Sequence, residues 1–430
     1  MTRSSADLRV GLLGRPSLGQ RSVRYGVFFA TYLYQGLVAG FSLTALANHL
    51  AARGVPATEV GLHFALAGLP WTLQPPLWGP WVDRAGDTRM GRRRPFAVAA
   101  LVGCHATLAL LLVAGGDAVG ALGLVFLVHS LFASLLDTAC DRMIMDHVPT
   151  RELGRVSACT RAGFVAGTSL SAAVFGWTLA NWGFAASARW LLVAAIVASL
   201  PMLLVRKAPA DPLWSLERRG PAPRRLPFRR FLRRTVIALR RPRALRLLAL
   251  CFGLDAALGL FELPFSIDLL QRQGWEAAGL SRLQAFLTLV SGTAGAVAVG
   301  LWSDRAGAAS PLRALLLGSA LTFVLAGIMI GAGLVGAAAP AILALTSVLP
   351  GLLIVALMPA LLAASRGRPG AATQFEVYMA AMNLGSVAGT AVAGWLAPLL
   401  PLQAIAALVA ATFFAAFRMA GRGDLLGARR

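Results

Sequence analysis

The stretch GPWVDRAGDTRMGRRR, residues Gly79–Arg94, decides the fold of this chain. It lies between two long apolar segments, and a shortened copy, GLWSDRAG at Gly300–Gly307, matches its first eight residues at six positions. A short charged segment that appears once in each half, between apolar spans, is typical of a duplicated polytopic membrane protein. Its glycines allow two helices to approach closely and to turn sharply. Its aspartate can accept hydrogen bonds from the N-terminal amides of a neighbouring helix.

The composition excludes an ordinary soluble domain. Apolar residues make up 57% of the chain and charged residues 13%, and the mean hydropathy is +0.69. From Tyr25 onward, apolar runs of about 20 residues recur, which is the length that crosses the hydrocarbon core of a bilayer. We therefore expect an all-α membrane protein with twelve transmembrane helices. The expected spans are 25–50, 58–82, 96–115, 119–141, 156–180, 187–205, 244–267, 277–302, 312–332, 337–362, 374–397 and 402–420.

The one long connection between these spans divides the chain into two halves. We expect two pseudo-symmetric six-helix bundles at 25–205 and 244–420, joined by a basic cytoplasmic linker at 206–243. Cytoplasmic segments at 1–24 and 421–430 flank them. Apolar and basic residues alternate within the linker, which predicts either an amphipathic helix at the inner membrane surface or a disordered basic tether.

The charge of the chain has a marked distribution along the sequence. The net charge is +22, and 35 of the 40 Lys and Arg residues fall in segments that the alternating topology places on one side of the membrane. This bias predicts cytoplasmic N- and C-termini in the cytoplasmic (inner) membrane, with the basic segments on anionic lipids. Nucleic-acid binding is not needed to explain the charge.

The Gly79–Arg94 segment, here called the signature segment, resembles the signature loop of the major facilitator superfamily. That loop joins the second and third helices, and a weaker copy joins the eighth and ninth. The resemblance implies a twelve-helix facilitator fold, and a conformational gate formed by residues of both copies. The implied gate residues are Gly79, Asp83, Arg84, Gly86, Arg89, Gly91, Arg92, Asp304 and Arg305.

A narrower resemblance is carried by five short motifs spread over most of the chain. They are YQGL at Tyr34–Leu37, GLPW at Gly68–Trp71, Asp137 with Asp141, RAG at Arg161–Gly163, and TQF at Thr373–Phe375. Together they resemble the AmpG-type branch, which contains muropeptide permeases, acetyl-CoA transporters and siderophore permeases of the RhtX/FptX kind. The length of the chain favours the twelve-span siderophore type. Gln74 stands where this resemblance leads us to expect a lysine.

Ionisable residues inside predicted spans are candidates for transport chemistry, because each costs at least about 2.5–3.5 kcal/mol in mid-membrane. Asp137 and Asp141 lie one turn apart on one face of the fourth span. Arg161 enters the fifth span from the same side, so we expect a carboxylate–guanidinium cluster. It would act either as a structural salt bridge or as a site where Arg161 binds an anionic group or an aspartate takes up a proton.

Other candidates lie in the seventh and eleventh spans. Asp255 and Glu262 are seven residues apart and face nearly the same way, so either could bind substrate or a proton; pairing of Glu262 with Arg282 is the structural alternative. Glu376 could take part in transport or only complement the helix dipole. Gln35 of the first span completes the predicted site. His129 could relay protons or be a packed, hydrogen-bonded histidine.

No enzyme, metal or cofactor signature occurs in the sequence. There is no phosphate-binding loop, no metal-ligand spacing and no CxxC pair among the four cysteines, so we expect a non-enzymatic protein without cofactors or bound metal. A secondary transporter follows, in which a monomer takes up a medium-sized polar or anionic solute, siderophore-like or muropeptide-like, together with protons. The alternatives are a drug or metabolite exporter and a non-transporting membrane receptor on the same fold.

Overall fold

The structure is a computed structural model. It describes residues 15–53, 55, 57–116, 119–219, 227–275, 277–367, 370–397 and 399–421. Within these ranges every regular element is a helix, and the only β-type pairings are two isolated bridges. The all-α prediction is confirmed.

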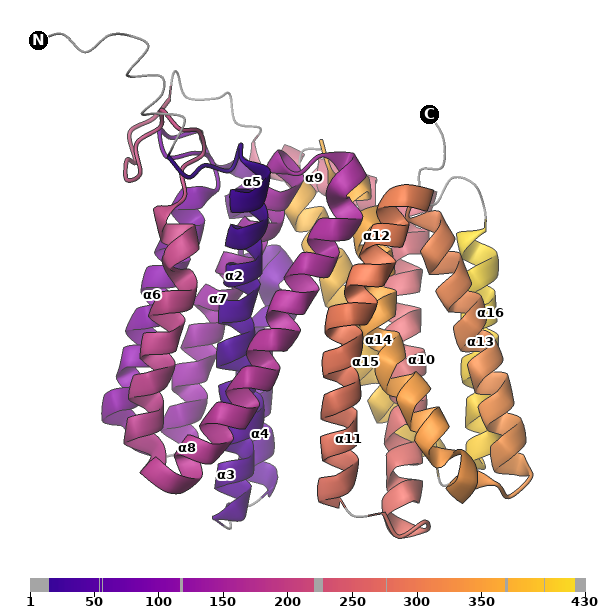
Figure 1. Ribbon diagram of the computed structural model, residues 1–430. Helices are drawn as coiled ribbons and strands as arrows, with labels where there is room; N and C mark the ends of the chain where they lie inside the picture. The colour runs from indigo at the N-terminus through magenta and orange to yellow at the C-terminus, as the bar shows by residue number, and fades with distance from the viewer. Residues whose placement is uncertain are drawn as a thin grey trace, which may run out of the picture. The chain divides into compact units, whose positions relative to one another are not determined.

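The helices follow one another along the chain with short connections (Figure 1). Those of the first half are α2 (Arg21–Gly40), the π-helical turn η1 (Phe41–Leu46), α3 (Ala47–Ala52), α4 (Ala57–Leu77), α5 (Gly79–Arg84), α6 (Arg94–Ala114), α7 (Val119–His147), the 3₁₀ turn η2 (Thr150–Glu152) and α8 (Leu153–Leu204). After α9 (Phe228–Leu239) come α10 (Pro242–Gln271), α11 (Ala277–Val290), the π-helical turn η3 (Ser291–Gly295), α12 (Ala296–Ala306), α13 (Ala309–Gly331), α14 (Val335–Ser365), α15 (Ala371–Leu396) and α16 (Leu402–Ala420).

These helices give the predicted number of membrane spans. Among the described residues, nine helical stretches are long and apolar enough to cross a bilayer. One of them, Thr150–Leu204, is 55 residues long and breaks at Gly183, whose φ of 74° is left-handed, so it forms two spans. With α4 and α15 the total is twelve. The sequence predicts a connection at 181–186 between these two spans. In the structure the helix is interrupted only at Gly183.

The chain divides into two compact units that do not follow the chain order throughout. The first comprises Met1–Val148, Ala162–Phe231 and Pro369–Thr373, and the second comprises Pro149–Arg161, Leu232–Arg368 and Gln374–Arg430. The start of α8 therefore packs with the second half of the chain, and the start of α15 packs with the first half. These two helix starts contact the two copies of the signature segment: the start of α8 contacts Asp304, and the start of α15 contacts Asp83.

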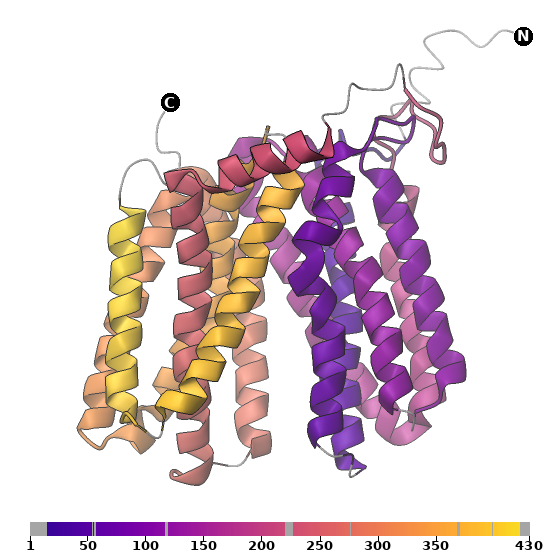
Figure 2. The same ribbon diagram turned by 180° about the vertical axis from the view of Figure 1, so that it is seen from behind.

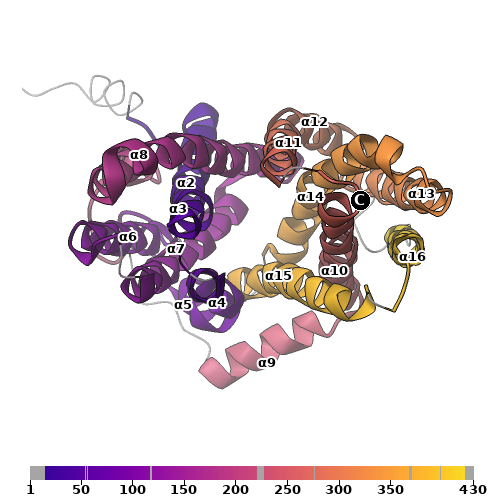
Figure 3. The same cartoon turned by 90° about the horizontal axis from the view of Figure 1, so that it is seen from below.

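Each unit contains a helix pair in backbone contact. In the first unit α2 lies against α8 (Figure 3), and a Cβ on Gly36 would lie 2.1 Å from the carbonyl oxygen of Phe164. In the second unit α15 lies against α10, and a Cβ on Gly389 would lie 2.1 Å from the carbonyl oxygen of Ala256. No side chain fits at such a distance, so small residues allow the close packing that membrane helices favour.

Aromatic side chains fill the interior of each unit. In the second unit Phe323 lies 5.1 Å from Phe261 and 5.6 Å from Phe413, measured between ring centroids. In the first unit Phe41 lies 5.4 Å from Phe175. Such pairs add about 0.5–1.5 kcal/mol each beyond the area they bury. Large apolar side chains such as Val113 and Trp395 are instead exposed, as expected where helices face lipid.

The linker between the halves is folded back on the first unit. The amide of Arg89 donates to the carbonyl of Glu217 (2.9 Å), and the amide of Arg219 donates to the carbonyl of Asp87 (3.1 Å). In the last part of the linker, α9 lies crosswise to α10 (Figure 2), with Phe231 buried and Ile237 exposed. Phe228–Leu239 is thus helical, and its place at the inner membrane surface stays a prediction.

Candidate functional site

The signature segment is a helical turn followed by a closed loop. Three prolines stand inside α4, which ends at Leu77, and the chain continues as α5 after Trp78. The loop beyond α5 is closed by Arg92, whose Nε donates to the carbonyl of Ala85 (2.8 Å) and whose Nη2 donates to the carbonyl of Asp83 (3.3 Å). The Arg92 guanidinium thus stabilises the loop through hydrogen bonds to its backbone carbonyls.

The Asp83 carboxylate caps the start of α15. Its Oδ1 accepts from the amide of Ala372 (3.0 Å), and its Oδ2 accepts from the amide and the hydroxyl of Thr373 (both 2.9 Å). This is the contact with helix N-terminal amides that the sequence predicts, and it complements the positive end of the helix dipole. The helices can come this close because residue 79 is a glycine. A Cβ at that position would lie 2.6 Å from the Cα of Thr373.

The second copy makes the same kind of contact at the start of α8. Asp304 accepts from the amides of Gly154 (2.8 Å, at Oδ1) and Arg155 (3.1 Å, at Oδ2), and from Nε of Arg155 (2.5 Å). A Cβ on Gly300 would lie 2.6 Å from the carbonyl oxygen of Gly154. Although this copy is shorter in sequence, its aspartate and glycine occupy equivalent positions in the contact.

The remaining gate candidates follow the two aspartates along the chain. Arg84 at the end of α5 stacks over the ring of Phe228, 5.5 Å from its centroid. Arg89 forms an exposed ion pair with Glu217 at 2.9 Å. Gly91 has a φ of 108°, which only glycine adopts without strain, and closes the turn after Thr88. Gly86 is half-buried in the same loop, and Arg305 is exposed at the end of α12.

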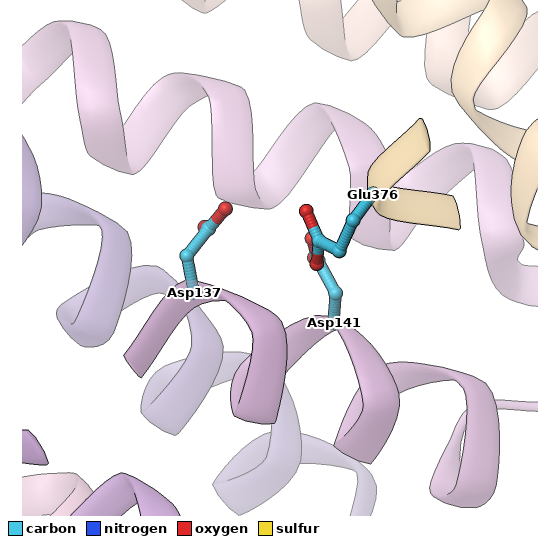
Figure 4. A group of neighbouring side chains, drawn as sticks. All are labelled: Asp137, Asp141 and Glu376. Atoms are coloured by element: carbon cyan, nitrogen blue, oxygen red, sulfur yellow. The ribbon is translucent and has the colours of Figure 1, made fainter. Parts of the chain in front are cut away.

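Two buried carboxylates lie on α7. Asp137 and Asp141 project from the same side of the helix, one turn apart (Figure 4). The hydroxyl of Tyr32 donates to Oδ1 of Asp141 (2.6 Å), and Nε2 of Gln74 donates to Oδ2 of Asp137 (3.1 Å). In the described part of the chain, neither carboxylate has a Lys, Arg or His nitrogen within 4 Å. Their partners are neutral.

A small cavity of about 50 Å³ opens between α2, α4 and α7 of the first unit, lined by Gln35, Trp71 and His129 among others. The Nε2 of Gln35 has no hydrogen-bond partner in the described structure. His129 Nδ1 lies 3.1 Å from the hydroxyl of Thr107, so the ring is buried and hydrogen-bonded on one side. Polar groups thus face a cavity within the bundle, as ligand sites in membrane transporters require.

The second unit contributes the other predicted site residues. Arg161 and Asp255 interact electrostatically, and among the described ion pairs they form none within 4 Å. The Nε of Arg161 has no hydrogen-bond partner in the part of the chain described. Glu262 is exposed on α10, while Glu376 is buried in the first turns of α15. The side chain of Arg282, the alternative partner of Glu262, lies outside the described residues.

A family model describes most of this chain. The model of the Major Facilitator Superfamily matches residues 26–375, which include both copies of the signature segment and the buried carboxylates. The chain belongs to the major facilitator superfamily. It is a multi-pass membrane transporter. No curated protein sequence matches it.

Solved structures of other transporters share the fold of this facilitator. The human organic anion transporter MFSD10 (TETRAN) is 17% identical, with a TM-score of 0.66 over 93% of this chain and 98% of that chain. The E. coli fucose:proton symporter FucP is 13% identical, with a TM-score of 0.69 over 93% and 97%. A bacterial homologue of the iron transporter ferroportin in the outward-facing state is 15% identical, with a TM-score of 0.60 over 93% and 98%. At these identities the likeness concerns the fold alone.

Two partners of the facilitator's carboxylates were not expected from the sequence. Tyr32 lies 109 residues from Asp141, and Gln74 lies 63 residues from Asp137. Gln74 also donates to the hydroxyl of Thr138 (3.0 Å) and the carbonyl of Ser134 (3.2 Å). The one available signal was that a polar side chain stands in an apolar helix, which does not say what it contacts.

Proposed function

We propose that this facilitator is a secondary active transporter that takes up a medium-sized polar or anionic solute together with protons. Both copies of the signature segment lie in this one chain, which supports a monomer as the transporting unit. Siderophore-like and muropeptide-like molecules are the leading substrates, on the resemblance of the short motifs to the AmpG-type branch. The observation that carries the proposal is the pair of buried aspartates on α7 with only neutral hydrogen-bond partners.

The physical argument concerns the cost of buried charge. Removing a carboxylate from water costs several kcal/mol unless a cation or a proton compensates it. Tyr32 and Gln74 supply one hydrogen bond each to the two aspartates, which offsets only part of that cost. Because the two carboxyl groups lie one turn apart, their negative charges also repel each other. Uptake of a proton by one of them removes the repulsion and the burial cost of that carboxylate, so the pair is suited to carry a proton through the transport cycle.

The charged copies supply a gate for alternating access, in which residues 25–205 rock against 244–420. Asp83 and Asp304 each hold a helix start by two backbone amides, and hydrogen bonds to a charged group contribute about 1.5–3 kcal/mol each. Such contacts are strong enough to favour one conformation and weak enough to be broken in every cycle. We infer that they are made in one state of the transporter and released in the other.

Arg161 and Asp255 are the proposed contacts for substrate. Arg161 retains an unused donor, and a guanidinium binds carboxylate or phosphate groups through two parallel hydrogen bonds. Asp255 and Glu262 offer acceptors on the same helix, and Gln35 faces the small cavity of the first unit. This set suits a solute that carries both anionic and hydroxyl or amide groups.

The proposal is tested by uptake into proteoliposomes with an acidic exterior. The probes are a ferric hydroxamate complex and a disaccharide anhydromuropeptide. We expect the wild type to accumulate one of them against its gradient, and Asp141→Asn to equilibrate that probe without accumulating it. Asp268→Asn is the matched control, since Asp268 pairs with the exposed Arg272. Accumulation that persists without a proton gradient would remove the coupling, and net outward flux in inverted vesicles would indicate an exporter.

Protonation can also be followed without a substrate. Infrared difference spectra between mildly alkaline and mildly acidic buffer should contain a protonated-carboxyl band that disappears in Asp137→Asn or Asp141→Asn and remains in Asp268→Asn. Spectra identical in all four proteins would show that the pair on α7 does not titrate.

A further inference from the structure

A second, larger cavity lies in the first unit, and neither Asp137 nor Asp141 lines it. Its volume is about 510 Å³, within the range of small-ligand sites. It is bounded by the end of the signature segment, the start of α6, the end of α7 and the linker. The cationic residues that line it are Arg92, Arg93, Arg94, Lys207 and Arg219.

Arg93 is one of the two most deeply buried cations of this cavity. It is 2% exposed, and its Nε and Nη1 have no hydrogen-bond partner in the described structure. The closest carboxylate is that of Asp146, 3.5 Å from Nε, and Asp146 is shared with Arg142 at 3.3 Å. Buried guanidinium N–H groups are almost always paired, so unused donors in a cavity indicate a missing acceptor.

The other cations of the cavity donate mainly to backbone carbonyls or already pair with a carboxylate. Arg94 donates to the backbone carbonyls of Leu203 (2.6 Å) and Leu213, which fix its position but do not neutralise it. Lys207 pairs with Asp87 at 3.2 Å. Asp87 and Asp146 are the acidic residues that line the cavity, so cations outnumber anions there. The start of α6 adds the positive end of a helix dipole.

The electrostatic state of Arg93 agrees with this imbalance. Burial, together with the neighbouring charges of Arg142 and Arg92, lowers its pKa to about 10. The side chain therefore remains charged at neutral pH but in an unfavourable environment. A bound anion would stabilise the charged form of the Arg93 guanidinium.

We propose that this cavity binds a phosphate-bearing anion, either the headgroup of an anionic phospholipid or a free phosphomonoester. Tetrahedral oxyanions accept from several guanidinium donors at once, and a basic pocket at the inner membrane face is suited to anionic headgroups. A phosphate oxygen within reach of Arg93 would satisfy its free donors. The lining of this cavity includes neither Asp137 nor Asp141, and the proposal does not depend on the substrate of transport.

Purified transporter in nanodiscs of known lipid composition tests the proposal. Thermal unfolding and native mass spectrometry are measured in phosphatidylcholine, with and without phosphatidylglycerol, and in phosphatidylcholine with added glycerol 3-phosphate. The variants are Arg93→Gln and the milder Lys207→Gln, whose side chain is only partly buried. Arg151→Gln is the control, since Arg151 is exposed and does not line the cavity.

We expect the wild type and Arg151→Gln to be stabilised by one of the two phosphate sources and to retain one bound copy. Affinity should fall about tenfold or more in Arg93→Gln, since a charged hydrogen bond is lost, and in the same direction in Lys207→Gln. Stabilisation by phosphatidylglycerol alone identifies a lipid site, and stabilisation by glycerol 3-phosphate identifies a soluble ligand. Equal responses in Lys207→Gln, Arg151→Gln and wild type, or no response to either source, would overturn the proposal.

Discussion

Single aspartates carry the two most specific contacts of this transporter. Asp83 and Asp304 each accept from two consecutive backbone amides, using both carboxylate oxygens. An asparagine of the same shape presents one oxygen and one NH₂ group, and the NH₂ group cannot accept from an amide. The substitution therefore tests the hydrogen bonds without changing the packing.

Asp83→Asn should expose the start of α15 to solvent exchange. We expect hydrogen exchange at Ala372 and Thr373 to rise about tenfold or more, because a charge-assisted hydrogen bond contributes about 1.5–3 kcal/mol. Asp304→Asn should do the same at Gly154 and Arg155. Mass-spectrometric hydrogen exchange on peptides that cover these positions is the measurement.

Asp87→Asn is the control for that experiment. Asp87 lies in the same signature segment as Asp83, but its carboxylate contacts Lys207 and none of these amides. Exchange at Ala372 and Thr373 that is equal in Asp83→Asn, Asp87→Asn and wild type would show that the Asp83 contact is not energetically significant.

At the scale of elements, the helices are held by close backbone approach more than by charge. Spanning helices that are apolar on nearly every face cannot be oriented by hydrophobicity alone, because lipid is as apolar as a neighbouring helix. Small residues determine which faces meet. α2 meets α8 at Gly36, and α15 meets α10 at Gly389, so equivalent pairs in the two halves use the same device.

Gly36→Ala should destabilise the first unit strongly. The added Cβ would lie 2.1 Å from the backbone oxygen of Phe164, so α2 and α8 must separate, at a cost of at least about 1–3 kcal/mol. Gly26→Ala on the same helix is the control, since nothing lies within 4 Å of its Cβ. Thermal unfolding in detergent should be lower for Gly36→Ala and unchanged or higher for Gly26→Ala. Equal unfolding temperatures would contradict the packing.

At the scale of the whole molecule, the distribution of basic residues predicts the orientation in the membrane. The linker carries the densest group of arginines, whereas the opposite connections carry few, Arg53 and Arg272, and that between α13 and α14 carries none. Since Lys and Arg are retained on the cytoplasmic side, the linker and both termini should be cytoplasmic.

Cysteine labelling with a membrane-impermeant maleimide measures that orientation. Leu216→Cys in the linker should react in inverted vesicles and not in intact cells, and Ala332→Cys between α13 and α14 should show the reverse. Both positions are exposed. The native Cys104, Cys140 and Cys251 are buried and should contribute little background. Labelling of Leu216→Cys in intact cells would reverse the proposed topology.

Hydropathy and short motifs determined, without any coordinates, the membrane class, the twelve spans and the two copies of the signature segment with their aspartates. These features depend on local composition and on residues close together in the chain. Only the tertiary structure decided which neutral partners the α7 carboxylates have and that Arg93 keeps unused donors in a cavity. Those outcomes depend on the rotation of each helix about its axis and on contacts between residues far apart in sequence, which a nearly uniform apolar pattern does not encode.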